Sequence, residues 1–323
     1  MIDLGLRIGV VGATGAVGRV TLDYLRQRGH TNVRAFASHR SAGTSVDGVD
    51  VEEATAEALG AGDLDVCFFS VGTTLSRELV PPAAAAGAVC VDKSAAFRLT
   101  PGIPLVVPEV NGARALEHDG VVANPNCCAI PLTMTLAPLH EAAGLRSVRV
   151  ATYQSVSGAG AGAAEALRGE VPDEHRLRMD WDFDGVEYDE EVKLREETRK
   201  ILELPDLPVS ASCVRVPVVV GHAEAVWVET ESPLAPEEAE RILGDAPGLR
   251  VSDVPTHDAA IGADAALVGR IRRDHSTESG LVLFVVCDNL RKGAALNAIQ
   301  IAELIVRAQD RDPRARIPIA QNP

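Results

Sequence analysis

The segment LRIGVVGATGAVGRV, residues 6–20, decides the fold class of this chain. Its first part, Leu6–Val11, is mainly apolar and predicts a buried strand, and Gly18–Arg28 predicts a helix. The glycines of GATGAVG stand between these elements and let the backbone turn sharply beside a pyrophosphate, at a helix N-terminus whose free N–H groups attract anions. The G-x-x-G-x-x-G spacing differs from the usual G-x-G-x-x-G, so the prediction of a nucleotide loop depends on its place between strand and helix.

Outward from this loop, the chain falls into two parts with different strand patterns. Before about residue 125, short apolar runs alternate with helical stretches, which predicts a parallel sheet covered on both faces. Its further strands are expected at Val33–Ser38, Asp65–Ser70, Ala88–Asp92, Leu105–Val107 and Val121–Ala123. After about residue 145, longer β-branched strands with polar alternation favour a mixed or antiparallel sheet with one solvated or interface face. These strands are expected at Val148–Ser155, Cys213–Val219, Ala225–Glu229, Ala266–Arg272 and Leu281–Cys287, and helices at Asp189–Leu202, Glu237–Leu243 and Gly293–Arg307.

Composition and charge exclude several classes of protein. The 323 residues carry 31 Lys and Arg against 46 Asp and Glu, and the net charge of −15 disfavours nucleic acid and anionic membranes as partners. No apolar run approaches the roughly 18 residues of a membrane span, and the N-terminus lacks a signal-peptide pattern. The six cysteines form no C-x-x-C pair and no metal-ligand spacing with the histidines, so we expect no metal and a reducing cytoplasm.

The residues after the second strand indicate which dinucleotide the loop binds. Sites for NAD usually place an acidic residue at the end of this strand to hold the ribose 2′-hydroxyl. Here the chain continues Ser38-His39-Arg40-Ser41, without an acid. Arg40 and the Ser41 hydroxyl suit a 2′-phosphate instead, which favours NADP.

Two adjacent cysteines, Cys127 and Cys128, differ from the other four, which lie in apolar runs and are expected in the core. They follow the polar Asn-Pro-Asn of residues 124–126 and precede Pro131, which is tolerated only in the first turn of a helix. Cys127 is therefore expected at or just before a helix N-terminus, where the positive end of the dipole lowers the pKa of a thiol. Cys128 is more typical of a packing residue, but spacing alone does not decide which of the two is the nucleophile.

His222 is the best candidate for the proton carrier that such a thiol needs. The segment CVRVPVVVGH, residues 213–222, predicts a strand that ends in Gly-His, so the ring would emerge at a strand end. A hydrogen-bonded structural histidine is the competing interpretation.

These motifs together resemble the aspartate-semialdehyde dehydrogenase family, in its bacterial branch, along nearly the whole chain. The matching segments are GATGAVG (12–18), SHRSAG (38–43), DKSAAFRL (92–99), PLVVPEVN (104–111), NPNC (124–127), TYQSVSGAG (152–160), EEVKLREETRKIL (190–202), CVRVPVVVGH (213–222), VGRIRRD (268–274) and DNLRKGAALN (288–297). The resemblance implies an NADP-binding domain at 1–126, completed by a C-terminal helix at 290–310, a catalytic and dimerisation domain at 127–289, and a tail at 311–323. The implied fold is α/β, a Rossmann-like parallel sheet domain plus an α+β substrate domain with a mixed sheet.

The resemblance also implies a role for individual residues. Cys127 would be the nucleophile that forms an acyl-thioester, His222 the general acid and base, and Gln154 the residue that orients the substrate. Arg215 would bind the substrate carboxylate and Glu190 its amino group, while Arg98, Lys193 and Asn126 would bind phosphate. The NADP site would be lined by Thr14, Gly15, Ala16, Val17, Arg40, Ser41, Ser70, Gly72, Ser157, Gly158 and Asn289.

The implied substrate, aspartyl phosphate, agrees with the chemistry of these residues. Its two anionic groups call for at least two basic anchors, and planar Arg suits a carboxylate. Glu190 and Lys193 lie three apart on one helical face and can point into one pocket, although an exposed intrahelical ion pair would have the same spacing. The reaction would be the reversible, NADP-dependent reductive dephosphorylation of aspartyl phosphate to aspartate semialdehyde in amino-acid biosynthesis, by a homodimer or possible tetramer.

Three alternatives stay open at this point. N-acetyl-γ-glutamyl-phosphate reductase shares the chemistry, but the ammonium partner Glu190 and the Arg215–His222 spacing favour the aspartyl substrate. A paralogue acting on a modified aspartyl phosphate is compatible with the sequence, and a catalytically silent NADP-binding scaffold would have lost at least one catalytic residue. Cys128 replaces the small hydroxyl residue that is more usual in the family, and we expect peroxide to inactivate this chain faster than a Cys128→Ser variant.

Overall fold

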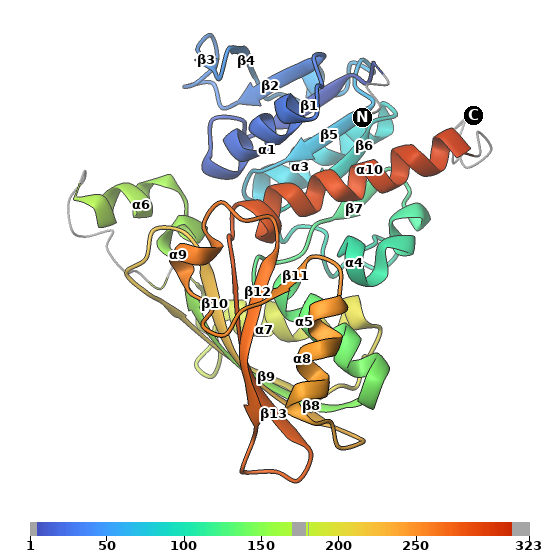
Figure 1. The fold of residues 1–323 in the computed structure, drawn as a ribbon. Coiled ribbons are helices and arrows are strands. Elements are labelled where there is room, and N and C mark those ends of the chain that lie inside the picture. Colours follow the sequence, from blue (N-terminus) through green and yellow to red (C-terminus); the bar gives the residue numbers. More distant parts are fainter. Residues whose placement is uncertain (1–4, 170–178, 180, 312–323) are drawn as a thin grey trace. The chain divides into compact units, whose positions relative to one another are not determined.

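The computed structural model describes residues 5–169, 179 and 181–311, and its strands form two separate sheets (Figure 1). One unit contains the described residues up to Pro125 together with those from Ala294 onwards, and the other is Asn126–Gly293. Among the helices in this part of the chain, none combines the length and apolar character needed to cross a bilayer.

The sheet of the first unit has seven strands in the order β3-β4-β2-β1-β5-β6-β7, all neighbours parallel except β3 and β4. The strands are β1 (Ile8–Val11), β2 (Val33–Ala37), β3 (Ser45–Val46), β4 (Val49–Glu53), β5 (Val66–Phe69), β6 (Val89–Asp92) and β7 (Val121–Ala123). The helices are α1 (Ala16–Gln27), α2 (Ala56–Leu59), α3 (Thr73–Ala85), α4 (Pro108–Asn111), the 3-10 helix η1 (Gly112–Glu117) and α10 (Leu296–Arg311). The predicted parallel sheet is thus confirmed.

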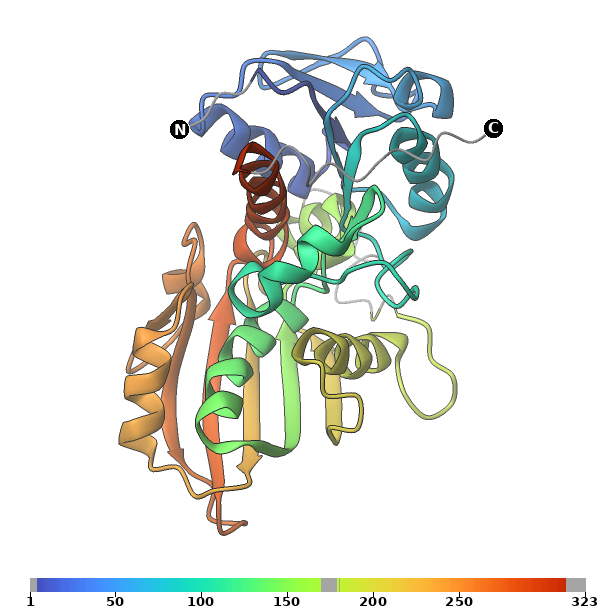
Figure 2. The ribbon, with the colours of Figure 1, turned by 90° about the vertical axis from the view of Figure 1, so that its right-hand side faces the viewer.

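Two apolar clusters cover the two faces of this sheet. Successive strand residues point to opposite faces, so Val10 packs in the cluster that includes Ile299 of α10, and Val11 in the cluster that includes Leu79 of α3. Helix α10 therefore returns from the far end of the chain to lie beside α1, as Figure 2 shows. This double covering explains why the strands of the first unit are apolar on both sides.

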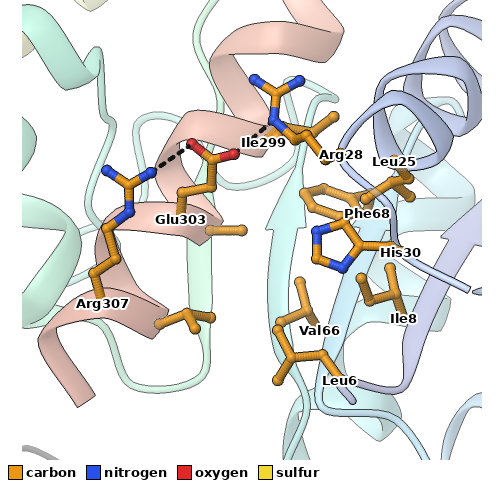
Figure 3. A pocket seen from close by; sticks show the side chains of 12 residues that line it. Leu6, Ile8, Leu25, Arg28, His30, Val66, Phe68, Ile299, Glu303 and Arg307 are labelled. Carbon is orange, nitrogen blue, oxygen red and sulfur yellow. Dashed lines mark hydrogen bonds and ion pairs between the residues drawn. The ribbon is translucent and has the colours of Figure 1, made fainter. Parts of the chain in front are cut away.

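A cavity of about 470 Å³ lies on the face that α1 and α10 cover (Figure 3). Its lining is mainly apolar and includes Phe68 and Ala302, but it also includes His30 and a chain of ion pairs. Glu303 accepts from Arg28 Nε at 2.6 Å and lies 3.6 Å from Arg307.

The sheet of the second unit has six strands in the order β11-β12-β13-β10-β8-β9. The pairs β8–β9 and β11–β12 are parallel and the others antiparallel, so the predicted mixed sheet is confirmed. The strands are β8 (Leu145–Gln154), β9 (Val209–Arg215), β10 (His222–Thr230), β11 (Leu249–Val251), β12 (Ala266–Arg273) and β13 (Gly280–Cys287). The helical elements are α5 (Ala129–Ala143), η2 (Val156–Ala159), α6 (Ala161–Arg168), α7 (Asp189–Leu202), α8 (Pro236–Asp245) and α9 (His257–Ala260). The π-helical turn η4 (Arg291–Ala295) begins in this unit and ends in the first.

Three sequence-based expectations need correction. Leu105–Val107 is not a strand, since it contributes only the isolated bridge from Leu105 to Ala123. The strand expected at 213–219 ends at Arg215, because Pro217 has no N–H to donate to a ladder. The closing helix begins as a π-helical turn and continues to Arg311, and the tail expected after it lies outside the described residues.

Candidate active site

Cys127 lies directly before the first turn of α5, whose N-cap residue is Cys128. The Asn126 side chain fixes this turn, because its Oδ1 accepts a hydrogen bond from the Cys128 N–H at 2.8 Å. The Asn126 N–H in turn donates to Glu197 Oε2 of α7 at 2.6 Å. The predicted position of Cys127 at a helix N-terminus is confirmed, and its side chain is partly exposed while Cys128 is buried.

The two sulfurs have opposite protonation preferences. The pKa of Cys127 lies well below the usual value of a thiol, because the Cys128 thiol hydrogen-bonds to it and because His222 and Arg215 favour the anion, although burial opposes this. Burial raises the pKa of Cys128 well above the usual value, and the neighbouring Cys127 anion adds to this. The electrostatics therefore favour Cys127 as the thiolate, a choice that spacing alone left open.

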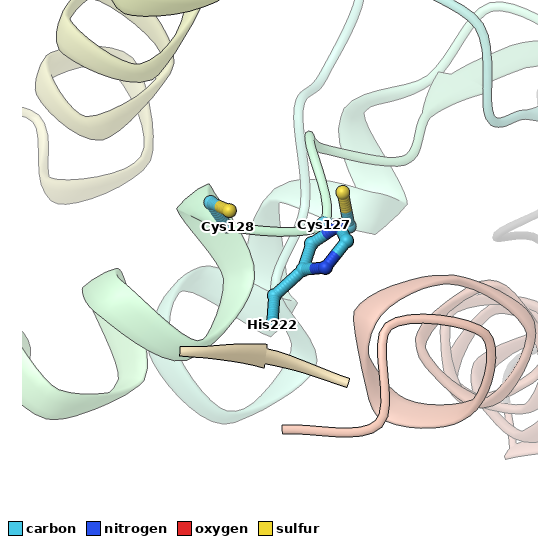
Figure 4. A group of neighbouring side chains, drawn as sticks. All are labelled: Cys127, Cys128 and His222. Atoms are coloured by element: carbon cyan, nitrogen blue, oxygen red, sulfur yellow. The ribbon is translucent and has the colours of Figure 1, made fainter. Parts of the chain in front are cut away.

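His222 is the first residue of β10, where it lies beside both cysteines (Figure 4). The prediction that it ends a strand is wrong, because β9 stops at Arg215 and a loop leads into β10. Its Nδ1 accepts from the Ser155 N–H at 3.0 Å, so the neutral ring carries its proton on Nε2. The Ser155 hydroxyl also lies 3.1 Å from Nδ1 and donates to Asn289 Oδ1 at 3.2 Å. These contacts hold the imidazole in one orientation.

A hydrogen-bonded chain connects Asn126 to Arg215 through two buried side chains. Glu190 Oε1 accepts from Asn126 Nδ2 at 2.8 Å and from Gln154 Nε2 at 3.3 Å. Gln154 Oε1 accepts in turn from Arg215 Nη1 at 3.1 Å. The fold thus brings together residues that lie up to 89 positions apart, since this chain runs from position 126 to 215.

Arg215 and His222 leave no room for a side chain at Gly158. A Cβ added there would lie 2.9 Å from Arg215 Nη1 and 3.2 Å from His222 Nε2. The Arg215 guanidinium also lies over the Trp181 ring, 4.5 Å from its centroid. The planar guanidinium is therefore oriented both by stacking and by its hydrogen bonds.

Lys193 and Arg98 make contacts within their own units. Lys193 pairs with Asp189 at 2.6 Å and lies 3.7 Å from Glu190 Oε2, so an intrahelical ion pair forms, although the Glu190 side chain is buried rather than exposed. Arg98, in the first unit, donates to the carbonyls of Asn124 at 3.0 Å and Lys93 at 2.7 Å.

The nucleotide loop has the geometry that a pyrophosphate requires. Gly12 has a φ of +80°, and a Cβ there would overlap the Ser70 carbonyl, while a Cβ at Gly18 would overlap the Gly12 carbonyl. Gly15 is the N-cap of α1 and makes no side-chain cap, so the N–H groups of Ala16 and Val17 in the first turn are not covered by a side chain. These residues fit a dinucleotide phosphate.

The other predicted cofactor residues are divided between the units. Arg40 is exposed in the turn after β2, with Ser41 beside it, and Gly72 is the N-cap of α3. Ser70 accepts from Lys93 Nζ at 2.9 Å. Ser157, Gly158 and Asn289 belong to the second unit, and Asn289 Nδ2 donates to Ser157 Oγ at 3.0 Å.

Sequence reasoning missed three residues around Cys127. Glu197 holds the Asn126 N–H, Ser155 orients His222, and Glu224 is a carboxyl, 1% exposed, beside the Cys128 thiol. Burial raises the pKa of Glu224 well above the usual value, although the hydrogen bond from Cys128 acts to lower it. An acid two residues after His222 lies on the same face of a strand, which is the one signal that could have indicated Glu224.

Comparisons with known proteins agree with this architecture. The semialdehyde dehydrogenase NAD binding domain matches residues 7–118, and the semialdehyde dehydrogenase dimerisation domain matches residues 136–292. The aspartate-semialdehyde dehydrogenase of Streptomyces akiyoshiensis is 45% identical over 335 residues, which cover 93% of this chain and 98% of that relative. That of Aquifex aeolicus is 41% identical and covers 94% and 99% of the two chains.

Solved structures show the same likeness. Aspartate semialdehyde dehydrogenase II of Vibrio cholerae, complexed with ASA, has a TM-score of 0.88 and 39% identity, over 94% of this chain and 98% of that one. The Candida albicans enzyme, solved with NADP, has a TM-score of 0.74 and 25% identity, over 93% and 98%. The matched domains indicate a nicotinamide cofactor and an oligomer. By sequence and by fold, the chain belongs to the aspartate-semialdehyde dehydrogenase family.

Proposed function

We propose that this protein catalyses the NADP-dependent, reversible reductive dephosphorylation of aspartyl phosphate to aspartate semialdehyde, through an acyl-thioester on Cys127. The observation that carries the proposal is the arrangement around one sulfur. A thiolate at a helix start lies beside an oriented imidazole, and a chain of buried polar groups leads from the same loop to an arginine.

Covalent catalysis divides the reaction into two steps. The Cys127 thiolate attacks the acyl carbon, the bond from carbon to the phosphate oxygen breaks, and a thioester and inorganic phosphate result. When bound, the dinucleotide supplies the hydride that reduces the thioester. His222 then donates a proton to the oxygen of the thiohemiacetal on Cys127 and takes it back as the carbon–sulfur bond breaks. Such proton transfer contributes roughly 10²–10⁴-fold to a rate.

The position of Ser155 suits this exchange of protons. Its N–H holds the neutral ring with the proton on Nε2, and its hydroxyl, 3.1 Å from Nδ1, can accept a hydrogen bond from the charged ring. Both forms of His222 thus have a partner at Nδ1.

We assign substrate recognition to the polar chain. Arg215 binds the α-carboxylate through a guanidinium already held flat by Trp181. Glu190, held by two amide donors, is proposed to pair with the substrate ammonium, and Gln154 to orient the acyl group. Lys193, Arg98 and Asn126 are proposed to bind the phosphate.

The proposed cofactor is NADP, with Arg40 and Ser41 at its 2′-phosphate. The support is the glycine loop, which fits a pyrophosphate, and the absence of an acidic residue after β2, where Ser38-His39-Arg40-Ser41 follows. The remaining proposed contacts are Thr14, Gly15, Ala16, Val17, Ser70, Gly72, Ser157, Gly158 and Asn289.

We further propose a homodimer in the cytoplasm. The six cysteines are all unpaired, which suits a reducing compartment. One face of the second sheet carries α5, α7 and α8, and the other leaves Tyr153 37% exposed, which supports this face as the dimer interface.

A direct assay tests the function. Purified protein is mixed with phosphate, NADP and aspartate semialdehyde, and absorbance of the reduced cofactor is followed. We expect turnover that Cys127→Ala abolishes and Cys128→Ala largely retains. Turnover with N-acetylglutamate semialdehyde but not with aspartate semialdehyde would overturn the assignment, and equal rates with NAD would overturn the cofactor preference.

A further inference from the structure

The start of α5 and the start of β10 place three soft donor groups together. One ligand atom each of Cys127, Cys128 and His222 lies within 4.8 Å of the other two (Figure 4). The residues are adjacent or 94 positions apart, so their spacing in the sequence gave no sign of a metal site. In space they form the Cys₂His donor set, which zinc sites use when they keep a fourth position open.

We propose that this cluster binds a thiophilic divalent cation such as Zn²⁺, and that the bound cation blocks the nucleophile. Two thiolate bonds of about 2.3 Å at a tetrahedral ion put the sulfurs about 3.8 Å apart, so the donors need to approach by only about 1 Å. Cys127 is partly exposed, which gives the ion a route of entry. Two thiolates also neutralise a divalent charge, so the occupied site would carry no net charge.

The surroundings supply a second shell. When Nε2 binds the ion, the ring proton must move to Nδ1. The Ser155 hydroxyl, 3.1 Å away, can then accept a hydrogen bond from this N–H. The Ser155 N–H then loses its acceptor. This loss weakens the binding of the ion and so favours reversible binding. Asn289, whose Oδ1 accepts from that hydroxyl, keeps Ser155 in place.

Cys128 is the residue that makes this site possible. With serine at position 128, only one thiolate and one imidazole would remain as soft donors, so zinc would bind much more weakly. Binding also requires the Cys128 thiol to release its proton, because only the thiolate coordinates. The proposal goes beyond the proposed function, and only the inhibition that it predicts depends on that function.

Cobalt provides a readout that does not need turnover. Reduced, chelator-free protein is titrated with Co²⁺, and the thiolate-to-cobalt absorption band is recorded for the wild type, Cys128→Ser and the matched control Cys213→Ala, a buried cysteine outside the cluster. We expect a saturable band in the wild type and control that Zn²⁺ displaces. In Cys128→Ser we expect about half the band intensity, since one of two thiolates is lost, and Zn²⁺ affinity lower by at least about tenfold.

Activity provides the second arm. Zn²⁺ should inhibit the wild type and the control, a chelator should restore the rate, and Cys128→Ser should need at least about tenfold more Zn²⁺ for the same inhibition. No band in the wild type, an equal band in Cys128→Ser, or an equal loss in Cys213→Ala would overturn the site. A protein without turnover but with the expected bands would contradict the proposed function and leave the metal site supported.

Discussion

The Cys127 sulfur depends on a neighbour that a sequence pattern does not normally associate with catalysis. The Cys128 thiol stabilises the anion by a hydrogen bond, while its own burial keeps it protonated. The same pair thus favours one thiolate and one protonated thiol. Because the two groups share one proton balance, a change at either position alters both.

The pH dependence of alkylation tests this balance. A thiol is modified only as the thiolate, so a lowered pKa keeps the rate at its plateau through neutral pH and lets it fall only as pH drops through that pKa. We expect modification of Cys127 by iodoacetamide, located by mass spectrometry, to have a midpoint well below the usual thiol value of about 8.5. The buried Cys67 and Cys213, whose pKa values burial raises, should stay unmodified in the folded protein. A midpoint between pH 8 and 9 would refute the thiolate assignment.

At Gly158, adding a single methyl group should lower the catalytic rate without lowering the stability of the fold. A Cβ there would push against the Arg215 guanidinium and the His222 ring, and misplacing catalytic groups by about 1 Å can cost 10²-fold in rate. We expect Gly158→Ala to lower kcat/KM by at least about tenfold with little change in Tm. Gly162→Ala is the matched control, because a Cβ there meets nothing within 4 Å. Equal activity of the two variants would show that the close packing at Gly158 is not needed.

At the scale of elements, local pattern predicted most helices and strands but not those that depend on turns. Helix α7 matches its predicted range, Asp189–Leu202, because its charged and apolar faces alternate with the helical period. The β3–β4 hairpin was missed, although its turn is Asp47-Gly48, both with positive φ, a strong hairpin signal between two valines. His222 was assigned to the wrong strand because the valines after Pro217 have a strand-like pattern without forming a ladder.

The candidate site was predictable only where local geometry determines it. Pro131 fixes the helix start, and with it the place of Cys127. Glu197 could not be found in this way, because its partner lies 71 positions away. For Glu224 the only signal was its place two residues after His222, since its partner Cys128 lies on a different element. Such contacts depend on how α7 and β10 pack, which no local pattern specifies.

Helix α10 offers a stability test through the cavity that it lines. Ala302 borders this cavity of about 470 Å³ and is 7% exposed, so a larger apolar side chain has space to enter it. Leucine is also a good helix former. We expect Ala302→Leu to raise the free energy of unfolding by about 0.5–2 kcal/mol, measured as an increase in Tm. The exposed Leu75→Ala serves as a control for nonspecific changes in apolar surface, and a lower Tm for Ala302→Leu would mean that the cavity cannot accept the side chain.

At the scale of the whole molecule, the two sheets differ in how their faces are covered. The parallel sheet is covered on both faces within its own unit, and it needs the returning helix α10 to complete one of them. The mixed sheet has α5, α7 and α8 on one face, and on the other its aromatic residues lie at cross-strand positions. The Tyr153 and Phe284 rings lie 6.3 Å apart, and Arg270 lies over Phe284 at 5.4 Å. A face of this composition is typical of a protein interface.

Trp227 lies at the centre of this open face, where it pairs with Arg149 on one side and Val282 on the other. An aspartate in its place would have to bury an unpaired charge when two copies meet, a cost of several kcal/mol that a monomer avoids. We expect the wild type to sediment as a dimer at micromolar concentration, and Trp227→Asp to sediment as a monomer with its far-UV circular dichroism unchanged. Leu75→Asp, an exposed apolar residue of α3 in the other unit, should stay dimeric. A monomeric wild type, or a Trp227→Asp variant that remains dimeric, would show that this face is not where the copies meet.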